Sequence, residues 1–220
     1  MFKEVLLVAG GGKENLKELI GEKKAHQFII GVDGGAIALL KAGLPIDLSI
    51  GDFDSISPSD LEVLKKKSKK VIELPAEKDK TDTEAALDYV RKNLQIEKIK
   101  MFGLLGGRLD HMISNLWIAY HPEYQDLLEK IYIVDQQNTL QFFFPGTYLL
   151  KKESNKKYLS FIGFSPLKNV TLKNVKYLLD EKSYLHPIGL ISNEFLDEEM
   201  EFSFEEGLMG VIQSRDKAEN

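Results

Sequence analysis

The chain contains no cysteine among its 220 residues. This absence excludes disulfide bonds, thiolate metal sites and thiol catalysis, and it fits a reducing compartment. The sequence also has no stretch of about 18 apolar residues that could span a membrane. No basic segment followed by a long apolar stretch marks a signal peptide at the N-terminus. We therefore expect a cytoplasmic protein with no membrane partner.

Positive charge is less abundant than negative charge. The formal net charge is −5, whereas proteins that bind the phosphate backbone of nucleic acids need a basic face. One basic cluster occurs at residues 65–70 (KKKSKK), and we interpret it as the solvated end of a helix rather than as a polyanion site. A nucleic acid is therefore not an expected partner. The 43% of hydrophobic residues predicts a packed core.

Apolar runs alternate with amphipathic stretches through the first two-thirds of the chain. This alternation predicts a mostly parallel sheet flanked by helices in an α/β domain that covers residues 1–137. The predicted strands are residues 5–9, 28–32, 48–50, 71–74, 99–103 and 131–134. The predicted helices are residues 16–24, 36–41, a segment that begins at 57–60, and residues 83–93 and 115–120.

The pattern changes at about residue 138. Helical periodicity fades, and short aromatic or β-branched runs separated by glycine, proline and asparagine take its place. This pattern is typical of a small antiparallel β sandwich, which we expect to form a second domain over residues 138–220. The expected strands lie within residues 140–144, 158–164, 170–172, 177–179, 190–191, 201–204 and 208–212.

Two acidic clusters follow predicted strands. Asp52 and Asp54 come after one strand, and Asp79 and Asp82 come after the next. The carboxyl ends of parallel strands meet at one edge of a sheet, which is where open α/β sheets bind ligands. In an extended segment, alternate residues such as Asp52 and Asp54 project on the same side. Gathered carboxylates suit Mg²⁺ beside phosphates, so the sequence predicts a metal–nucleotide site, although turn or helix-capping chemistry is the competing interpretation.

Glycine-rich turns and one arginine add to this edge. Residues 10–12 are three glycines after a strand, and Asp33 is followed by Gly34 and a second glycine. Such turns bring backbone N–H groups close to phosphate or ribose, and Asp33 could accept a hydrogen bond from a ribose hydroxyl, although a plain tight turn is the commoner explanation. Arg108 supplies a planar fork for phosphate oxygens, and Asp110 could orient Arg108 or the metal. His111 could transfer a proton, although a helix-capping or packed imidazole is the preferred interpretation.

In this order and spacing, the motifs resemble the bacterial branch of the thiamine pyrophosphokinase family over essentially the whole chain. The matching segments are residues 33–36 (DGGA), 51–55 (GDFDS), 79–82 (DKTD), 106–111 (GGRLDH) and 191–194 (ISNE). The resemblance implies an α/β domain followed by a β sandwich, with homodimers whose active sites lie at the subunit interface. It further implies transfer of the diphosphoryl group of ATP to the hydroxyl of thiamine, with Mg²⁺, giving thiamine diphosphate and AMP.

The resemblance also assigns roles to residues. Mg²⁺ and the phosphates would be held by Asp52, Asp54 and Asp82, with Asp79 nearby. The resemblance leaves the acceptor of the hydroxyl proton open, and we expect it to be a metal-linked aspartate, Asp54 or Asp82. Thiamine would be contacted by Ser192 and Asn193. The catalytic group would be completed by Arg108, and the nucleotide would be bound by Asp33, Gly34, Asp79, Thr81, Arg108 and Asp110.

One departure from the family concerns tryptophan. Some relatives place a tryptophan near the thiamine ring in the β domain, whereas Trp117, the single tryptophan, falls in the α/β part. The stacking role would then pass to Tyr177 or Phe195.

Two other functions match part of this pattern. A haloacid-dehalogenase-like phosphatase also carries an Asp-x-Asp after a strand, but Ile56 stands where that signature has Thr or Val, and the motif follows the third strand instead of the first. A non-catalytic nucleotide-binding module would use the same cleft. The intact acidic clusters argue against a module that has lost catalytic activity.

Overall fold

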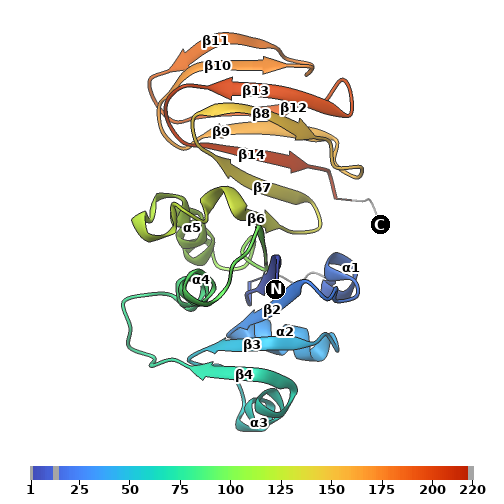
Figure 1. The fold of residues 1–220 in the computed structure, drawn as a ribbon, viewed down its shortest axis with the longest axis vertical. Helices are drawn as coiled ribbons and strands as arrows, with labels where there is room; N and C mark the ends of the chain where they lie inside the picture. The colour runs from blue at the N-terminus through green and yellow to red at the C-terminus, as the bar shows by residue number, and fades with distance from the viewer. Residues whose placement is uncertain (1, 12–14, 218–220) are drawn as a thin grey trace. The chain divides into compact units, whose positions relative to one another are not determined.

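The computed structural model describes residues 2–11 and 15–217, and it divides into two compact units, Met1–Gln136 and Gln137–Asn220 (Figure 1). Gly12, the last residue of the first predicted glycine turn, lies outside the described residues. No helix of the described part is both long and apolar enough to cross a membrane.

Six parallel strands form the sheet of the first unit, in the order β6-β5-β1-β2-β3-β4. The strands are β1 (Glu4–Val8), β2 (Gln27–Val32), β3 (Ile46–Gly51), β4 (Ser68–Glu73), β5 (Lys98–Phe102) and β6 (Ile131–Val134). The helices are α1 (Leu16–Ile20), α2 (Gly34–Lys41), α3 (Pro58–Lys67), α4 (Asp82–Asn93) and α5 (Leu109–Trp117), with 3₁₀ turns at Ile118–Tyr120, Pro122–Tyr124 and Leu128–Lys130.

The central strands of this sheet are buried on both faces. In β1, four consecutive residues are buried, which requires cover on each side because successive side chains alternate. Leu6 and Ile29 pack in one core with Leu39 of α2 and Leu64 of α3. The predicted mostly parallel, helix-flanked sheet is therefore confirmed.

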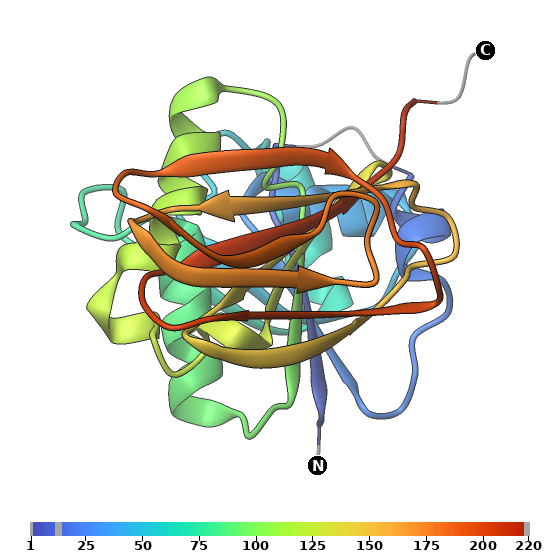
Figure 2. The ribbon, with the colours of Figure 1, turned by 90° about the horizontal axis from the view of Figure 1, so that it is seen from above.

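Eight antiparallel strands form two sheets in the second unit, ordered β12-β9-β14-β7 and β11-β10-β13-β8. Figure 2 shows strands of this unit, coloured from yellow to red, seen from above. Their core joins Phe161 and Val211 of one sheet to Leu172 and Phe202 of the other, and this is the predicted sandwich. The strands are β7 (Asn138–Phe143), β8 (Gly146–Lys151), β9 (Tyr158–Gly163), β10 (Leu167–Lys173), β11 (Leu179–Tyr184), β12 (Ile188–Asn193), β13 (Glu199–Phe204) and β14 (Met209–Ser214).

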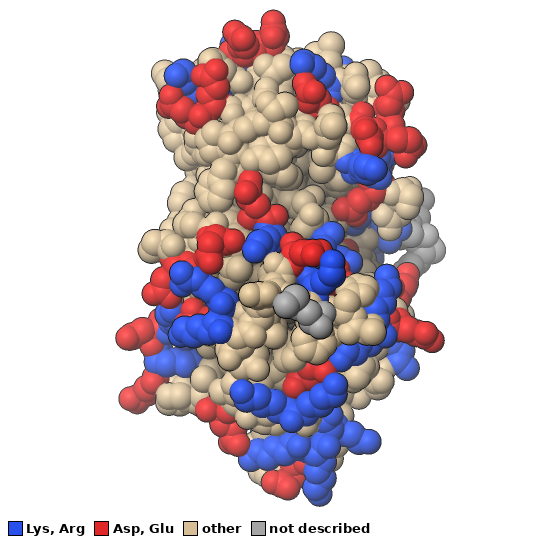
Figure 3. All heavy atoms as spheres, viewed as in Figure 1, with Lys and Arg blue, Asp and Glu red and all other residues tan. Residues whose placement is uncertain are grey.

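The basic cluster at residues 65–70 is shared between two elements instead of ending one helix. Helix α3 ends at Lys67, and β4 begins at Ser68 on the edge of the sheet. Figure 3 shows Lys and Arg side chains gathered over this end of the unit. The cluster is solvated as predicted. Its lysines on β4 also discourage this edge strand from pairing with another sheet.

A buried carboxylate holds the amino ends of β2, β3 and β4 together. Asp47 is 3% exposed, accepts a hydrogen bond from the Ile29 N–H (2.8 Å) and pairs with the ammonium groups of Lys23 and Lys69, the latter at 2.9 Å. Burial works against ionisation, but these donors outweigh it and leave the pKa of Asp47 below its usual value. The carboxylate is therefore a stabilising anion.

Asp47→Asn is expected to lower the free energy of unfolding by about 2 kcal/mol at neutral pH, because the charge-assisted hydrogen bonds are lost. A lowered folded-state pKa stabilises the protein above the unfolded value, about pH 3.9, and this contribution is lost as the pH falls through the folded pKa. The gap between wild type and variant, measured by urea unfolding, should therefore shrink below about pH 4.

Glu97→Gln is the matched control, because Glu97 pairs with Lys3 on the surface with both side chains well exposed. Its effect should stay below about 0.5 kcal/mol. A gap for Asp47→Asn that is equally large at pH 3 and pH 7 would contradict the assigned role.

Candidate active site at the carboxyl edge of the parallel sheet

A cleft of about 790 Å³ lies within the first unit, formed by the loops after β1, β2, β3, β4 and β5 and by the first turns of α4 and α5. Carboxyl ends of parallel strands are the usual ligand-binding edge of such a sheet. The predicted site residues on its lining are Asp33, Gly34, Asp79, Thr81, Asp82, Arg108 and Asp110. The structure thus brings together predicted residues that follow three different strands, β2, β4 and β5.

Asp52 joins the cleft through a lysine that the sequence analysis did not assign. The Lys78 ammonium lies on the cleft and donates a hydrogen bond to Asp52 Oδ2 at 3.1 Å. It also forms an ion pair with Asp82 Oδ1 at 3.1 Å. Partial burial works against ionisation of Asp52, but the Asp54 N–H and the Lys78 ammonium hold its pKa below the usual value. The two acidic clusters are therefore joined by a lysine in this structure.

The Asp52-Phe53-Asp54 segment is not extended, so the predicted alternation is wrong. Phe53 adopts φ 56°, in the left-handed region, and its ring is buried in the core of the sheet. The Asp54 N–H turns back to Asp52 Oδ1 at 3.3 Å, and the Asp54 side chain is exposed. Burial of the aromatic ring between the two acids sets this turn.

Asp33 is held in a strained and electrostatically unfavourable place. Its φ is 45°, a region that non-glycine residues rarely adopt. Its Oδ1 is buried and has no hydrogen-bond partner within the described part of the chain. Burial, followed by the nearby carboxylates of Asp82, Asp52 and Asp54, raises the pKa of Asp33. Such strain is a common mark of a functional position.

Helix α4 begins with a capping box that fixes the second acidic cluster. The Thr81 Oγ1 accepts the Glu84 N–H at 3.2 Å, and Glu84 Oε2 accepts the Thr81 N–H at 2.8 Å. Thr81 is therefore the N-cap of α4, and Asp82 is its first residue. This arrangement leaves the Asp82 carboxylate free to face the cleft in the first turn.

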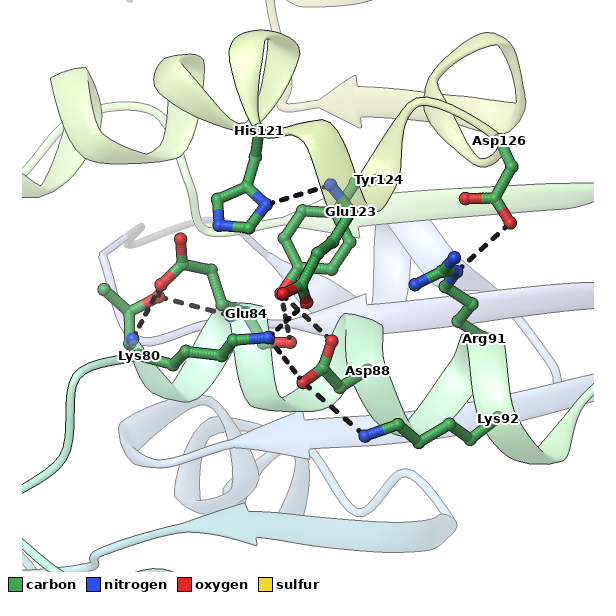
Figure 4. A network of polar contacts seen from close by, with 10 residues as sticks. Lys80, Glu84, Asp88, Arg91, Lys92, His121, Glu123, Tyr124 and Asp126 are labelled. Carbon is green, nitrogen blue, oxygen red and sulfur yellow. Dashed lines mark hydrogen bonds and ion pairs between the residues drawn. The ribbon is translucent and has the colours of Figure 1, made fainter.

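Lys80, on the same loop, is turned toward a different acidic group. Figure 4 shows its ammonium paired with Asp88 Oδ2, at 2.9 Å, and with Glu123. The hydroxyl of the fully buried Tyr124 lies 3.2 Å from Asp88 Oδ1. The hydrogen bonds that the Lys80 ammonium donates to Asp88 and Glu123 raise the pKa of Lys80. This network anchors the loop of residues 78–81 to α4 and the 3₁₀ turn at Pro122–Tyr124.

Arg108 and Asp110 form a two-point pair at the rim of the cleft. The Arg108 Nε and Nη2 lie 3.2 and 2.7 Å from the two carboxylate oxygens of Asp110. The guanidinium holds the pKa of Asp110 below its usual value. Both side chains are exposed, so the guanidinium is open to an anionic ligand. Helix α5 begins at Leu109, earlier than the predicted residue 115, which places Asp110 and His111 in its first turn.

The glycines of these loops are required first by packing. A Cβ on Gly35 would stand 2.0 Å from the Val8 carbonyl oxygen, and one on Gly11 would stand 2.7 Å from the Gly103 oxygen. The tight-turn interpretation is therefore sufficient for Gly35 and Gly11. Gly34 differs, because its nearest neighbour would be the Gly10 Cα at 3.6 Å.

In the second unit, Asn193 and Ser192 have different surroundings. The Asn193 side chain is buried, and it exchanges two 2.9 Å hydrogen bonds with the backbone of Tyr177. Ser192 is exposed and has φ 60°. Phe195 is buried, whereas Tyr177 is 58% exposed, so Tyr177 is the more accessible of the two aromatic candidates.

The chemistry of the acidic group suits a hard divalent cation. No three His, Asp or Glu side chains in the described part of the chain are arranged to hold a metal ion, and Lys78 contacts both Asp52 and Asp82. Asp33, Asp52, Asp54 and Asp82 nevertheless interact electrostatically, and one buried oxygen of Asp33 lacks a partner. Oxygen donors of this kind are those that Mg²⁺ prefers.

Comparison with known proteins assigns the chain to a family. Residues 21–133 match "Thiamin pyrophosphokinase, catalytic domain", and residues 147–209 match "Thiamin pyrophosphokinase, vitamin B1 binding domain". The chain is 38% identical to a thiamine pyrophosphokinase of Bacillus subtilis over 98% of its own length and 100% of that protein.

Solved structures agree with this assignment. A thiamin pyrophosphokinase family protein from Enterococcus faecalis is 38% identical, with a TM-score of 0.88 over 98% of this chain and 100% of the other. A thiamin pyrophosphokinase from Geobacillus thermodenitrificans is 33% identical, with a TM-score of 0.83 over 98% of this chain and 99% of the other. The chain therefore belongs to the thiamine pyrophosphokinase family.

Proposed function

We propose that the protein is a thiamine diphosphokinase that transfers the diphosphoryl group of ATP to the hydroxyl of thiamine, giving thiamine diphosphate and AMP. The observation that carries the proposal is the 38% identity to a thiamine pyrophosphokinase over the full length of both chains. The thiamine oxygen forms a bond to the β-phosphorus, the bond from that phosphorus to the AMP oxygen breaks, and the hydroxyl proton passes to a carboxylate, Asp54 or Asp82.

The residues of the cleft divide this work. Mg²⁺, held by Asp52, Asp54 and Asp82, would neutralise charge on the phosphates when bound. Arg108 is open to solvent and offers its fork to phosphate oxygens. The buried Oδ1 of Asp33, which has no partner among the described residues, is suited to accept a hydrogen bond from a ribose hydroxyl.

Backbone and loop positions complete the nucleotide side. Gly34 begins helix α2, where backbone N–H groups favour anions. Asp79 and Thr81 lie on the nucleotide-binding lining, with Thr81 acting by fixing the start of α4. Asp110 acts by orienting Arg108.

We place the thiamine-side contacts in the second unit at Ser192 and Asn193. Ser192 offers an exposed hydroxyl, whereas the buried amide of Asn193 acts by holding Tyr177. An aromatic ring at position 177 is accessible for stacking on a heterocycle.

We further propose a homodimer and a cytoplasmic location. None of the residues of α5, all of which the structure describes, is buried, and Leu109, Ile113 and Trp117 are exposed at intervals of four residues. An apolar stripe of this kind supports burial against another copy, which sedimentation equilibrium would measure. The lack of cysteine supports the cytoplasmic location.

The deciding assay mixes the protein with thiamine, ATP and Mg²⁺ and follows products by ³¹P NMR and chromatography. We expect AMP and thiamine diphosphate in equal amounts. Formation of ADP with thiamine monophosphate would refute diphosphoryl transfer. Binding of ATP without any turnover would favour the non-catalytic nucleotide-binding module.

A further inference from the structure

Lys78 links three segments at the floor of the cleft. Its ammonium donates hydrogen bonds to Asp52 Oδ2 after β3 and to the Pro75 carbonyl after β4, each at 3.1 Å. The same nitrogen lies 3.1 Å from Asp82 Oδ1 at the start of α4. The side chains of Lys78, Asp52 and Asp82 are 16%, 17% and 22% exposed, so water screens these contacts only partly.

The Lys78 ammonium contacts two of the carboxylates that would hold a divalent cation. It touches one oxygen of each, Asp52 Oδ2 and Asp82 Oδ1. A divalent cation that used these two oxygens would displace the ammonium from them. The ammonium and the divalent cation would therefore compete for the same pair of carboxylates.

The charge balance makes such an exchange favourable only when phosphate is present. Four carboxylates, Asp33, Asp52, Asp54 and Asp82, interact in this group, and Lys78 supplies one positive charge among them. A displaced ammonium loses strong partners unless another anion replaces them. Lys78 lines the cleft, so the phosphates of a nucleotide bound there would lie near its ammonium group.

We propose that Lys78 is a resident counter-cation of the Asp52–Asp82 pair, which gives up its place to the divalent cation and transfers its ammonium to the nucleotide phosphates. The inference rests on the proposed function, since it takes ATP and a divalent cation as the ligands of this cleft. Lys78 thereby couples the binding of the two. Metal alone binds weakly because it must expel the lysine, and the positive charge of Lys78 on the cleft lining favours the nucleotide even before the metal binds.

The test measures binding of each ligand separately in wild type and in Lys78→Met. Mn²⁺ binding without nucleotide is followed by electron paramagnetic resonance, and ATP binding in EDTA is followed by calorimetry. We expect Lys78→Met to tighten Mn²⁺ binding by about tenfold, because the competing cation is gone, and to weaken metal-free ATP binding by about tenfold. Opposite changes in the two affinities are the signature of the exchange.

Lys80→Met is the matched control, since it removes the same charge from the same loop and cleft. The Lys80 ammonium pairs with Asp88 and Glu123 instead of with Asp52 and Asp82. Its effect on Mn²⁺ binding should be under about threefold. Lys78→Gln, a neutral variant that keeps a hydrogen-bond donor, replaces Lys78→Met if the methionine variant does not fold.

Three outcomes would overturn the inference: unchanged Mn²⁺ affinity in Lys78→Met and Lys78→Gln, an equal gain in Lys80→Met, or loss of both affinities together. The first two leave the metal role of the carboxylates intact, provided that wild type binds Mn²⁺ in the presence of ATP. Failure of wild type to bind Mn²⁺ even with ATP would instead refute the proposed metal site itself.

Discussion

Asp82→Asn is expected to lower kcat by about 100- to 1,000-fold while the protein stays folded. The Asp82 carboxylate faces the cleft from the first turn of α4, where it is within 3.1 Å of Lys78 and interacts with Asp33. The asparagine side chain has nearly the same shape as the Asp82 side chain but carries no negative charge. Helix α4 should be unaffected because Thr81, which caps it, is unchanged.

The measurement is kcat at saturating ATP, thiamine and Mg²⁺, with thermal unfolding followed by circular dichroism. Asp60→Asn is the matched control, since Asp60 also lies in the first turn of a helix, α3, and is exposed. Its kcat should remain within about twofold of wild type. A similar, near-wild-type kcat for Asp82→Asn would remove Asp82 from the catalytic group.

The position of the cleft was predictable because it follows from a rule of chain topology. Alternating strands and helices imply a parallel sheet, and polar residues after strands then gather at one edge. Asp33, Asp82 and Arg108 lie far apart in the sequence, yet all three line the same cleft. The α/β fold with a following β sandwich is confirmed for the same reason, since periodicity determines the element type.

Contacts between side chains were not predictable in this way. Lys78 lies in the loop before helix α4, so the spacing rule for ion pairs on a helix does not reveal its contact with Asp82, and its contact with Asp52 depends on how two loops meet. The left-handed turn at Phe53 depends on the burial of its ring in a core that the local pattern does not reveal. Strand β8 was missed because only one of its six residues is buried.

The early start of α5 has a related explanation. Arg108 occupies the cap position without a side-chain cap hydrogen bond, so the usual sequence signal for a helix start is missing. Helix α4, which has a complete capping box at Thr81 and Glu84, was located to within one residue. The sequence therefore predicts the start of a helix well where a side-chain cap determines it, as in α4, and poorly where that cap is missing, as in α5.

Two adjacent glycines in the turn after β2 differ in why glycine is needed: packing requires Gly35, whereas it does not require Gly34. Gly35→Ala is expected to lower the free energy of unfolding by about 3 kcal/mol. Its new Cβ would meet the Val8 oxygen at 2.0 Å and the Ala9 Cα at 2.8 Å, both of them backbone atoms. Strand β1 is paired with β2 on one side and β5 on the other, so this backbone cannot move without breaking sheet hydrogen bonds.

Gly34→Ala provides the matched comparison, because it makes the same chemical change one residue earlier in the same helix. Its Cβ would have 3.6 Å to the Gly10 Cα, an ordinary contact, and alanine favours a helix over glycine by about 1 kcal/mol. We therefore expect Gly34→Ala to leave the free energy of unfolding unchanged or to raise it, as measured by urea titration of both variants. Equal stabilities for the two variants would show that the loops after β1 and β2 can separate without cost. In that case the glycine at position 35 would need an explanation in ligand binding, because packing would no longer supply one.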